Sequence, residues 1–440
     1  MLLVKRPIDT LLLLLTGYVG LHLPRSFLLL YVIVGLLFWR TCLVHLEESE
    51  PLRWVQSPGV LRSALFLLVF SVTYGFGMLA WGFWLLPADA LDALNALLLP
   101  GLLFLAGVRA ASLPRTWSTR LLLTYAFGAL LYVLIALAFA RSPWWNWSQV
   151  FPVSITVPWG SSVAINVRSV EQNGYPALLL LAPGLMLTFG SSTVPRRLLG
   201  AAFLSLSALG AHVVGALEGR LGWLTLVVSM LPVVVLLAVR LIASVPRSWC
   251  RSWPIPALVA MFGLAGVGTG IAVLNSRLQG SGIWSQGLCE ERFSLYASIL
   301  ARLGQAPWGG RRLQFPFRTC GDQALNLVFG AAGQVGIAHN VWLDIYYTLG
   351  FVPVLLLLAA LAPSALAVVK GFVSAWPAWD WQVCLRWCCF CLLLGQWLFQ
   401  PLQYSDGLLY YLSFFVAGLF LVEGRRAFLE PESRRRTLHS

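Results

Sequence analysis

The stretch AHNVWLDIYYTLGFVPVLLL (residues 338–357) begins with a histidine and an asparagine and then continues into a largely apolar run. His339 is one of only 5 histidines in the chain, and a long polar segment precedes it. An apolar run of this kind is typical of a helix that enters a membrane. The stretch therefore predicts a membrane-spanning helix that starts at its polar end.

The rest of the chain has the same apolar character. Of its 440 residues, 59% are hydrophobic and 11% are charged, whereas a soluble protein has about 25% charged residues. The apolar residues fall in blocks of roughly 20, the length of helix that crosses ~30 Å of hydrocarbon. We therefore predict an all-α, polytopic integral membrane protein. Its candidate spans, about 12 in number, are residues 7–24, 26–42, 62–86, 90–108, 120–140, 174–192, 198–217, 221–242, 254–274, 340–362, 382–401 and 407–424.

These spans divide the sequence into four parts. Residues 1–274 hold the first nine predicted helices, and residues 275–338 form a long external loop before the tenth. Residues 339–424 hold the last three helices, and residues 425–440 form a basic tail. An even number of spans places both termini on one side of the membrane. Since no signal-peptide cleavage pattern is present, we expect the first apolar block to be retained as a helix.

The basic residues indicate which side holds the termini. All but ten of the 30 Lys and Arg lie on that side, and an excess of Lys and Arg marks the cytoplasmic loops of membrane proteins. The net charge of +13 is then a topology signal and an attraction to anionic lipid. It does not indicate nucleic-acid binding, because no soluble basic domain is present. The ten exceptions are Arg25, Arg141, Arg168, Arg220, Arg277, Arg292, Arg302, Arg311, Arg312 and Arg318.

Six of these exceptions lie in the external loop, residues 275–338, together with only three acidic residues. An ordinary solvated loop explains them, because long translocated loops tolerate arginine. A ligand that carries phosphates is the other interpretation. Cys289 and Cys320 lie in the same loop, and an oxidising compartment would favour a disulfide between them, with two unrelated thiols as the alternative. Such a disulfide would hold the loop arginines in one constrained unit.

Two elements are predicted within the external loop. CEERFSLYASILARLG (289–304) has an apolar helical stripe flanked by arginines, which predicts a short amphipathic helix at the membrane interface. PWGGRRLQF (307–315) predicts a turn whose glycines allow close approach to a ligand. The apolar stripe consists of Phe293, Tyr296, Ile299, Leu300 and Leu303.

Two residues at predicted helix starts are candidates for binding or catalysis. Arg220 opens the span at 221–242, where the alternatives to a ligand contact are a snorkelling side chain or a pair with Glu218. His339 opens the span at 340–362, where the alternative is an interfacial anchor. The helical stripe predicted there consists of His339, Leu343, Tyr346 and Gly350.

Motifs of several enzyme classes are missing from the sequence. The histidines show no HxxH or HExxH spacing of a metal site. There is no GxSxG nucleophile elbow and no phosphate-cradling Walker motif. The motifs that usually indicate a hydrolase or a nucleotide-driven enzyme are therefore missing, and we expect neither a metal nor a cofactor.

Three separated motifs share the predicted outer face. GRLGWL (219–224) places Arg220 and Leu224 at an R-x3-L spacing at the start of a helix. ERFSLYASILARLGQAPWGG (291–310) has an arginine at the start of the external helix and then a P-x-x-G turn. HNVWLDIYYTLG (339–350) has the pattern H-N-x9-G. Together these motifs resemble those of the O-antigen ligase and O-antigen polymerase superfamily of bacterial envelope glycosyltransferases.

The resemblance implies a reaction and its substrates. Such enzymes transfer a glycan from an undecaprenyl-pyrophosphate carrier to an acceptor hydroxyl, without metal or nucleotide. In a ligase the acceptor is lipid A–core. The resemblance also implies a bacterial inner-membrane protein with a periplasmic active site. Its expected partners are the two lipid-linked substrates and membrane lipids.

The resemblance further suggests roles for particular residues. The leaving group is a lipid pyrophosphate, and the planar guanidinium of arginine forms paired hydrogen bonds to phosphate oxygens. We expect Arg220 and Arg292 to clamp the pyrophosphate and stabilise its developing charge. Arg311 and Arg312 are further candidates for the same role. His339 would act as a general base toward the acceptor hydroxyl, or orient it.

One departure from the ligase pattern leaves the acceptor open. Ligases often carry a pair of threonines shortly after the glycine of the third motif. This chain has FVPV (351–354) there, and Pro353 is expected to bend the helix. The closest alternative is an O-antigen or exopolysaccharide polymerase, and a protein O-glycosyltransferase is another. A transporter or flippase for a lipid-linked sugar is the alternative from a different class, although the sequence shows no internal repeat and no paired mid-membrane charges.

Overall fold

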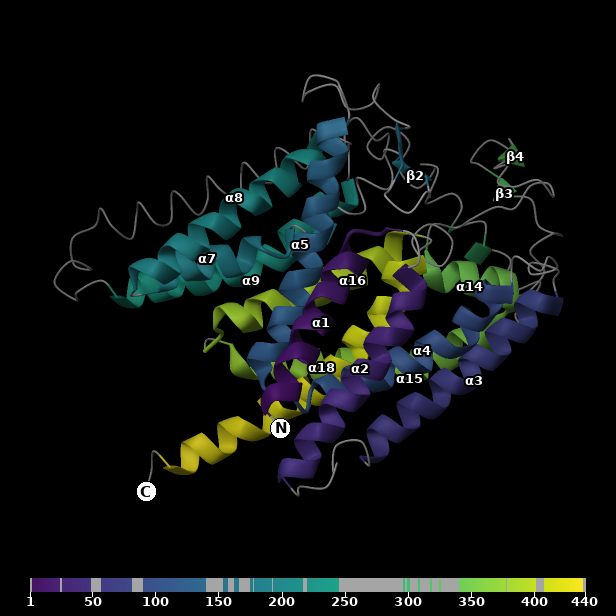
Figure 1. The fold of residues 1–440 in the computed structure, drawn as a ribbon, viewed down its shortest axis with the longest axis horizontal. Helices are drawn as coiled ribbons and strands as arrows, with labels where there is room; N and C mark the ends of the chain where they lie inside the picture. Colours follow the sequence, from purple (N-terminus) through teal and green to yellow (C-terminus); the bar gives the residue numbers. More distant parts are fainter. Residues whose placement is uncertain are drawn as a thin grey trace.

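Long helices dominate the structure, a computed structural model of the chain, and the prediction of a helical, polytopic membrane protein is confirmed (Figure 1). The structure describes residues 2–23, 26–48, 57–80, 90–139, 153–156, 162–165, 175–176, 178–191, 193–216, 220–244, 296, 299–300, 308, 317–318, 324–325, 340–376, 378–400 and 407–437.

The described helices are α1 (Leu2–Gly20), α2 (Ser26–Glu48), α3 (Pro58–Ala80), α4 (Ala90–Ala110), α5 (Arg115–Phe139), α7 (Leu181–Gly190), α8 (Val194–Ala216), α9 (Arg220–Ser244), α14 (Val341–Leu349), α15 (Phe351–Ala375), α16 (Trp381–Phe399) and α18 (Gly407–Thr437). The described strands form two antiparallel pairs, β1 (Val153–Thr156) with β2 (Ser162–Ile165) and β3 (Phe317–Arg318) with β4 (Ala324–Leu325).

Seven helices of this described part are long and apolar enough to cross a membrane, namely α2, α3, α4, α5, α15, α16 and α18. They account for most of the predicted spans in the two ends of the chain. The predicted span at 254–274 lies outside the described residues. The total of about 12 spans therefore stays a prediction.

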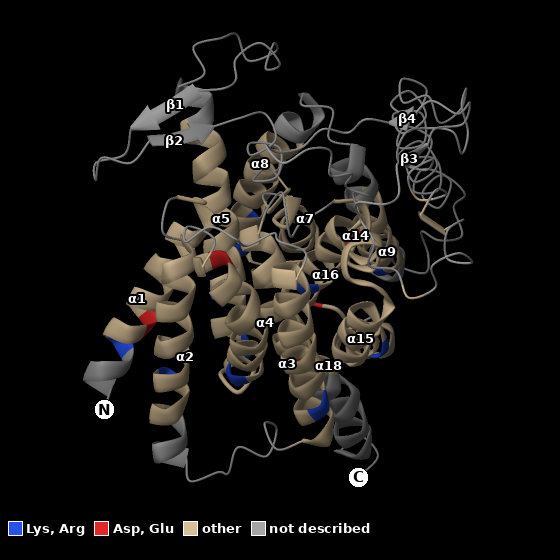
Figure 2. Ribbon diagram, turned by 90° about the vertical axis from the view of Figure 1, so that its right-hand side faces the viewer, with Lys and Arg blue, Asp and Glu red and all other residues tan. Residues whose placement is uncertain are grey.

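The helix bundle has two chemically different ends. The end called the basic end below holds both termini and the starts of α5 and α16 (Figure 1). The opposite end, called the loop end, holds the start of α14 and the end of α16. In Figure 1 strands β2, β3 and β4 lie at the upper right, away from both termini, and Figure 2 shows the Lys and Arg along the helices of the bundle in blue. The lysines and arginines whose side chains are described lie toward the basic end; they are Arg6, Arg40, Arg62, Arg109, Arg115, Arg120, Arg196, Arg197, Arg240, Lys370 and Arg386.

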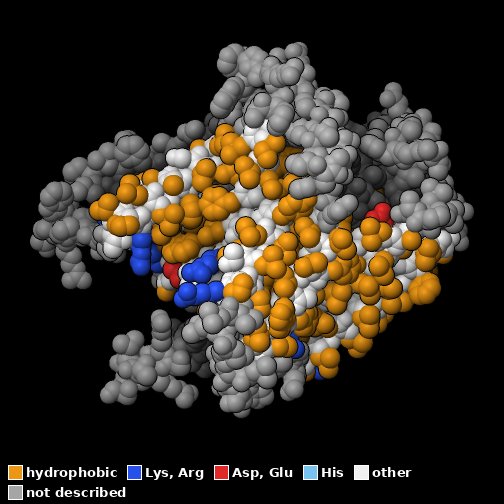
Figure 3. Space-filling model, in the orientation of Figure 1, with side chains coloured by type: hydrophobic (Ala, Val, Ile, Leu, Met, Phe, Trp, Pro, Cys, Tyr) orange, Lys and Arg blue, Asp and Glu red, His pale blue; other side chains and the backbone are white. Residues whose placement is uncertain are grey.

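Between the two ends the surface of the bundle is apolar. The face shown in Figure 3 is covered by hydrophobic side chains, with Lys and Arg along its lower-left edge. Large apolar residues such as Leu61 and Phe76 of α3 are more than half exposed. Such a surface suits contact with lipid chains, where exposed hydrocarbon has no cost.

Two glycines form a close crossing of α4 and α18. A Cβ added to Gly107 would collide with the carbonyl oxygen of Phe415, and one added to Gly418 would collide with that of Phe104. Small residues let membrane helices approach closely, which matters because lipid supplies no hydrophobic force between helices. The crossing therefore depends on the absence of both side chains.

This crossing gives a direct stability prediction. Gly107→Ala should lower the free energy of unfolding by about 1–3 kcal/mol, because a carbonyl of the facing backbone must move. Gly101→Ala in the same helix is the matched control, since a Cβ at Gly101 meets nothing within 4 Å. It should stabilise the helix by about 0.5–1 kcal/mol. Thermal unfolding in detergent micelles compares the two, and equal midpoints would contradict the close crossing.

The predicted span at 340–362 is not one helix. Helix α14 ends before Gly350, which has φ 99° and ψ −173°, a conformation essentially restricted to glycine. Helix α15 begins directly after it and is by itself long enough to cross a membrane. Pro353 falls in the first turn of α15, where a missing N–H breaks no helical hydrogen bond. The bend expected at the proline thus occurs at Gly350. Of the predicted stripe, Leu343 and Tyr346 lie on α14, Gly350 lies just after its end, and His339 lies outside the described residues.

The predicted span at 174–192 is also interrupted. Helix α7 has 10 residues, about 15 Å of helix, and residues 179–180 before it form a turn. Pro183 explains why α7 begins only just before it. A proline ring clashes with the carbonyl four residues earlier, so the helix cannot extend further toward the N-terminus. Helix α7 packs against α8 and α16 instead of crossing alone.

The external loop contains strand as well as helix. Strands β3 and β4 fall within residues 275–338, where a short amphipathic helix and a turn were predicted and no strand. For the helix predicted at 289–304, the described residues Tyr296, Ile299 and Leu300 are helical. Ile299 is buried against the bundle, whereas Leu300 is half exposed. Leu300 therefore does not belong to the buried stripe.

Candidate functional site

Most residues expected to act on substrate lie outside the described residues. These are Arg292, Arg311, Arg312 and His339, together with the two cysteines of the predicted disulfide, Cys289 and Cys320. Arg220 is the first residue of α9, and only its backbone is described. The structure does describe residues within or next to each of the three motifs, and these locate the candidate site.

A side-chain cap sets the start of α14. Asn340 has an extended backbone, with φ −152° and ψ 121°, and its Oδ1 accepts a hydrogen bond from the N–H of Leu343 at 3.0 Å. Asparagine is among the best N-cap residues because its amide oxygen satisfies an N–H that the helix itself leaves unpaired. The start of α14 is therefore encoded locally, by the residue that follows His339.

The same asparagine connects α14 to α16. Its Nδ2 donates a hydrogen bond to the carbonyl oxygen of Leu398 at 2.8 Å. This carbonyl is in the last turn of α16, where carbonyl oxygens have no N–H donor within the helix. The hydroxyl of Tyr296, from the second motif, donates to the same oxygen at 3.5 Å. Two motifs far apart in the sequence thus meet at one carbonyl group.

A backbone hydrogen bond joins the second and third motifs at another point. The N–H of Phe351 donates to the carbonyl oxygen of Trp308 at 2.9 Å. Phe351 is the first residue of α15, so its N–H has no acceptor within the helix. Trp308 lies in a turn, as predicted for the P-x-x-G segment. The external turn is thereby tied to the break at Gly350.

Aromatic side chains pack α14 against the end of α16. The rings of Trp342 and Trp397 are 5.3 Å apart, and Trp397 in turn stacks on Tyr410 of α18 at 5.4 Å. Within α14, burial raises the pKa of the Tyr346 hydroxyl. Aromatic packing and the hydrogen bonds of Asn340 are thus among the contacts that hold α14.

The first motif reaches the same end of the bundle through the pairing of α9 with α16. Arg240 donates from Nη2 to the carbonyl oxygen of Trp379 at 2.7 Å, and Ser229 contacts Cys388. These pairs show that the two helices run antiparallel. The start of α9 therefore points toward the end of α16 rather than toward its beginning.

A buried ion pair forms a second candidate site, at the basic end. Arg386 of α16 is 1% exposed, and its Nε lies 2.5 Å from Oε2 of Glu423 of α18. Its Nη2 donates to the hydroxyl of Ser118 at 2.6 Å and to Oε1 of Glu423 at 3.0 Å. Its Nη1 donates to the hydroxyl of Thr119 at 2.9 Å. The network joins α5, α16 and α18.

The pairing of Arg386 with Glu423 was not predicted from the sequence, which shows no paired charges at mid-membrane depth. Arg386 is the sixth residue of α16, so it lies about 7.5 Å inside the helix start rather than at mid-membrane depth. That position suits a structural link between helices better than a site for coupled transport, which is built near the midplane. A charged residue inside an apolar span was the available signal, but its partner lies on another helix.

In the described part of the chain, no three His, Cys, Asp or Glu side chains are grouped to hold a metal ion.

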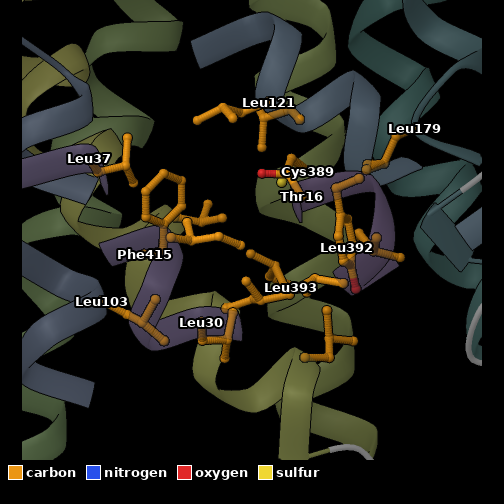
Figure 4. A pocket seen from close by; sticks show the side chains of 17 residues that line it. Thr16, Leu30, Leu37, Leu103, Leu121, Leu179, Cys389, Leu392, Leu393 and Phe415 are labelled. Carbon is orange, nitrogen blue, oxygen red and sulfur yellow. The ribbon is translucent and has the colours of Figure 1, made fainter. Parts of the chain in front are cut away.

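An apolar cavity of about 70 Å³ lies inside the bundle between α1, α2, α4, α5, α16 and α18 (Figure 4). Its lining is mostly leucine, including Leu30, Leu103 and Leu392. The hydroxyl of Thr16, which also lines it, is already bonded to the carbonyl of Leu12 at 2.7 Å. Cavities of this kind stay dry, so this one offers room for hydrocarbon. The chemistry is better sought at the loop end.

No protein-family model matches the chain, and no curated protein matches it.

Proposed function

We propose that the protein is a membrane glycosyltransferase of the O-antigen ligase type. It would transfer an O-antigen polysaccharide from undecaprenyl pyrophosphate to a hydroxyl of lipid A–core. The reaction would take place at the loop end of the bundle. An O-antigen or exopolysaccharide polymerase, which uses lipid-linked repeat units, is the second candidate.

The observation that carries this proposal is the meeting of the second and third motifs at the loop end. Tyr296 and Asn340 donate to the same carbonyl, that of Leu398. Trp308 accepts from the first N–H of α15, and the start of α9, which carries the first motif, points toward the same end of α16. An enzyme that clamps a pyrophosphate and activates a hydroxyl needs its groups gathered in this way, because the reacting atoms must be held together.

The distribution of charge supports an orientation in the membrane. The lysines and arginines with described side chains lie toward the basic end, and an excess of such residues marks the cytoplasmic side. We therefore infer cytoplasmic termini and a periplasmic loop end in a bacterial inner membrane. This places the proposed reaction on the side where the lipid-linked glycan and lipid A–core would meet.

The proposed mechanism needs only side chains of the protein. The acceptor hydroxyl oxygen forms a bond to the anomeric carbon of the donor glycan as the bond from that carbon to the pyrophosphate oxygen breaks. His339 takes the hydroxyl proton as general base. Undecaprenyl pyrophosphate leaves with one additional negative charge, which Arg220 and Arg292 stabilise through paired hydrogen bonds, assisted by Arg311 and Arg312.

Reconstitution tests the proposed function. Purified protein in vesicles would be mixed with an undecaprenyl-pyrophosphate-linked glycan and lipid A–core, and product masses measured. Glycan attached to lipid A–core supports the ligase. Longer lipid-linked glycan without attachment supports the polymerase, and movement of the donor across the bilayer without bond formation would favour a transporter.

The role of His339 predicts a specific kinetic change. His339→Ala should lower the turnover number by about 10²–10⁴-fold, the usual contribution of a general base. Donor affinity should stay the same, because the histidine acts on the acceptor. His439→Ala, in the basic tail, is the matched control and should leave both quantities unchanged. Loss of donor affinity with normal turnover would exclude the base role, and inhibition by a strong chelator would exclude metal-independent transfer.

A further inference from the structure

We propose that Asn340 is a positioning residue of the loop-end site, because its single amide fixes both where α14 begins and where that start lies relative to α16. The inference rests on the proposed function for the reaction that it serves. The geometry of the amide does not depend on that reaction.

The two ends of the Asn340 amide do different work. Oδ1 accepts from the N–H of Leu343 and caps α14, while Nδ2 donates to the carbonyl oxygen of Leu398. An amide supplies both an acceptor and donors, whereas an ionised carboxylate of the same size only accepts. Asparagine therefore satisfies an orphan N–H of one helix and an orphan carbonyl of another with one short side chain.

The carbonyl that receives this bond lies on a well-held helix. At its start, α16 has its own N-cap, since Oδ1 of Asp380 accepts from the N–H of Val383 at 2.8 Å. Further along, the fully buried Arg386 links α16 to α5 and α18. At its end, Trp397 packs against α18 and α14. Asn340 thus ties the start of α14 to a helix whose position is fixed elsewhere.

The consequence concerns the residue before the cap. His339 is covalently next to Asn340, so the cap defines the direction from which the chain enters α14. A general base must come within hydrogen-bonding reach of the proton that it takes. A displacement of 1 Å can lower a rate by about 100-fold. Asn340 would therefore act on the reaction through His339, without touching substrate.

Two variants separate the two bonds of the amide. Asn340→Asp keeps the cap acceptor but removes the donor to Leu398, and Asn340→Ala removes both. Asp380→Ala is the matched control, because it removes an N-cap of similar geometry at the basic end. Hydrogen exchange of residues 341–349, and the turnover number and KM for donor in vesicles, would be measured for all three in the full-length protein.

The expected results differ between the variants. Asn340→Asp should lower turnover by about tenfold with KM for donor unchanged, while residues 341–349 keep their protection. Asn340→Ala should lower turnover further and increase exchange in 341–349. Asp380→Ala should increase exchange only at the start of α16 and leave turnover unchanged.

Wild-type turnover in Asn340→Asp would overturn the inference, and so would a raised KM at normal turnover. A wild-type protein that transfers no glycan would overturn the proposed function alone. In that case the exchange of residues 341–349 in Asn340→Ala would still decide whether Asn340 fixes α14.

Discussion

Arg386→Ala should unfold at a clearly lower temperature than the wild-type protein, with a loss of about 3–5 kcal/mol in the free energy of unfolding. The substitution leaves the carboxylate of Glu423 without its partner at a largely buried position. It also removes the donors to the hydroxyls of Ser118 and Thr119. Removing one member of a buried ion pair is costly because the other stays desolvated and unpaired. Thermal unfolding in detergent would measure the change.

A second ion pair provides the matched control. Arg115 and Asp380 lie 3.9 Å apart, and their side chains are 46% and 53% exposed. Exposed pairs of this kind contribute about 0–1 kcal/mol, so Arg115→Ala should leave the unfolding temperature nearly unchanged. The double variant Arg386→Met with Glu423→Leu should recover most of the loss, because no charge is then left buried. A double variant as unstable as Arg386→Ala would contradict the ion-pair explanation.

The largest expected effect on activity comes from the proposed pyrophosphate clamp. Arg220→Ala and Arg292→Ala should each lower glycan transfer by about a thousandfold or more, as expected for an arginine that stabilises charge on a leaving phosphate. Both proteins should still insert and unfold normally, because the proposed role of each arginine is to bind the substrate and not to hold the fold. Transfer in vesicles and thermal unfolding would be measured together.

Two further variants sharpen the test of the clamp. Arg62→Ala removes an exposed arginine at the basic end of α3 and should leave transfer unchanged. Lysine at position 220 or 292 should restore only part of the activity, because an ammonium group keeps the charge but loses the paired hydrogen bonds. Normal transfer by either alanine variant would remove that arginine from the mechanism.

The helical membrane fold follows largely from the sequence. Seven apolar runs became helices long enough to span a membrane within the described residues, because hydropathy and length are local properties of the chain. The N-cap of α14 was also locally readable, since asparagine before an apolar run is a helix-start signal.

Helix interruptions were harder to predict from hydropathy. An apolar window does not distinguish one helix from two, so residues 340–362 were expected to form a single span. Gly350 divides them because it adopts a backbone conformation that other residues avoid. At 174–192 the interruption follows from Pro183, whose ring blocks the preceding turn. Both residues can be recognised in the sequence as helix breakers. The sequence alone does not tell whether the helix continues before or after each of them.

By itself, the sequence determined that this protein is a helical membrane protein, and it predicted that most of its basic residues lie on one side, because burial in lipid and charge asymmetry depend on composition along the chain. Only the tertiary structure decided which separated residues meet. The sequence does not identify the carbonyl of Leu398 as the acceptor, since every residue in the last turn of a helix has a carbonyl without a helical partner. Tyr296 and Asn340 converge on it because α14 and the external segment pack against the end of α16. The pairing of Arg386 with Glu423 likewise required the packing of two helices.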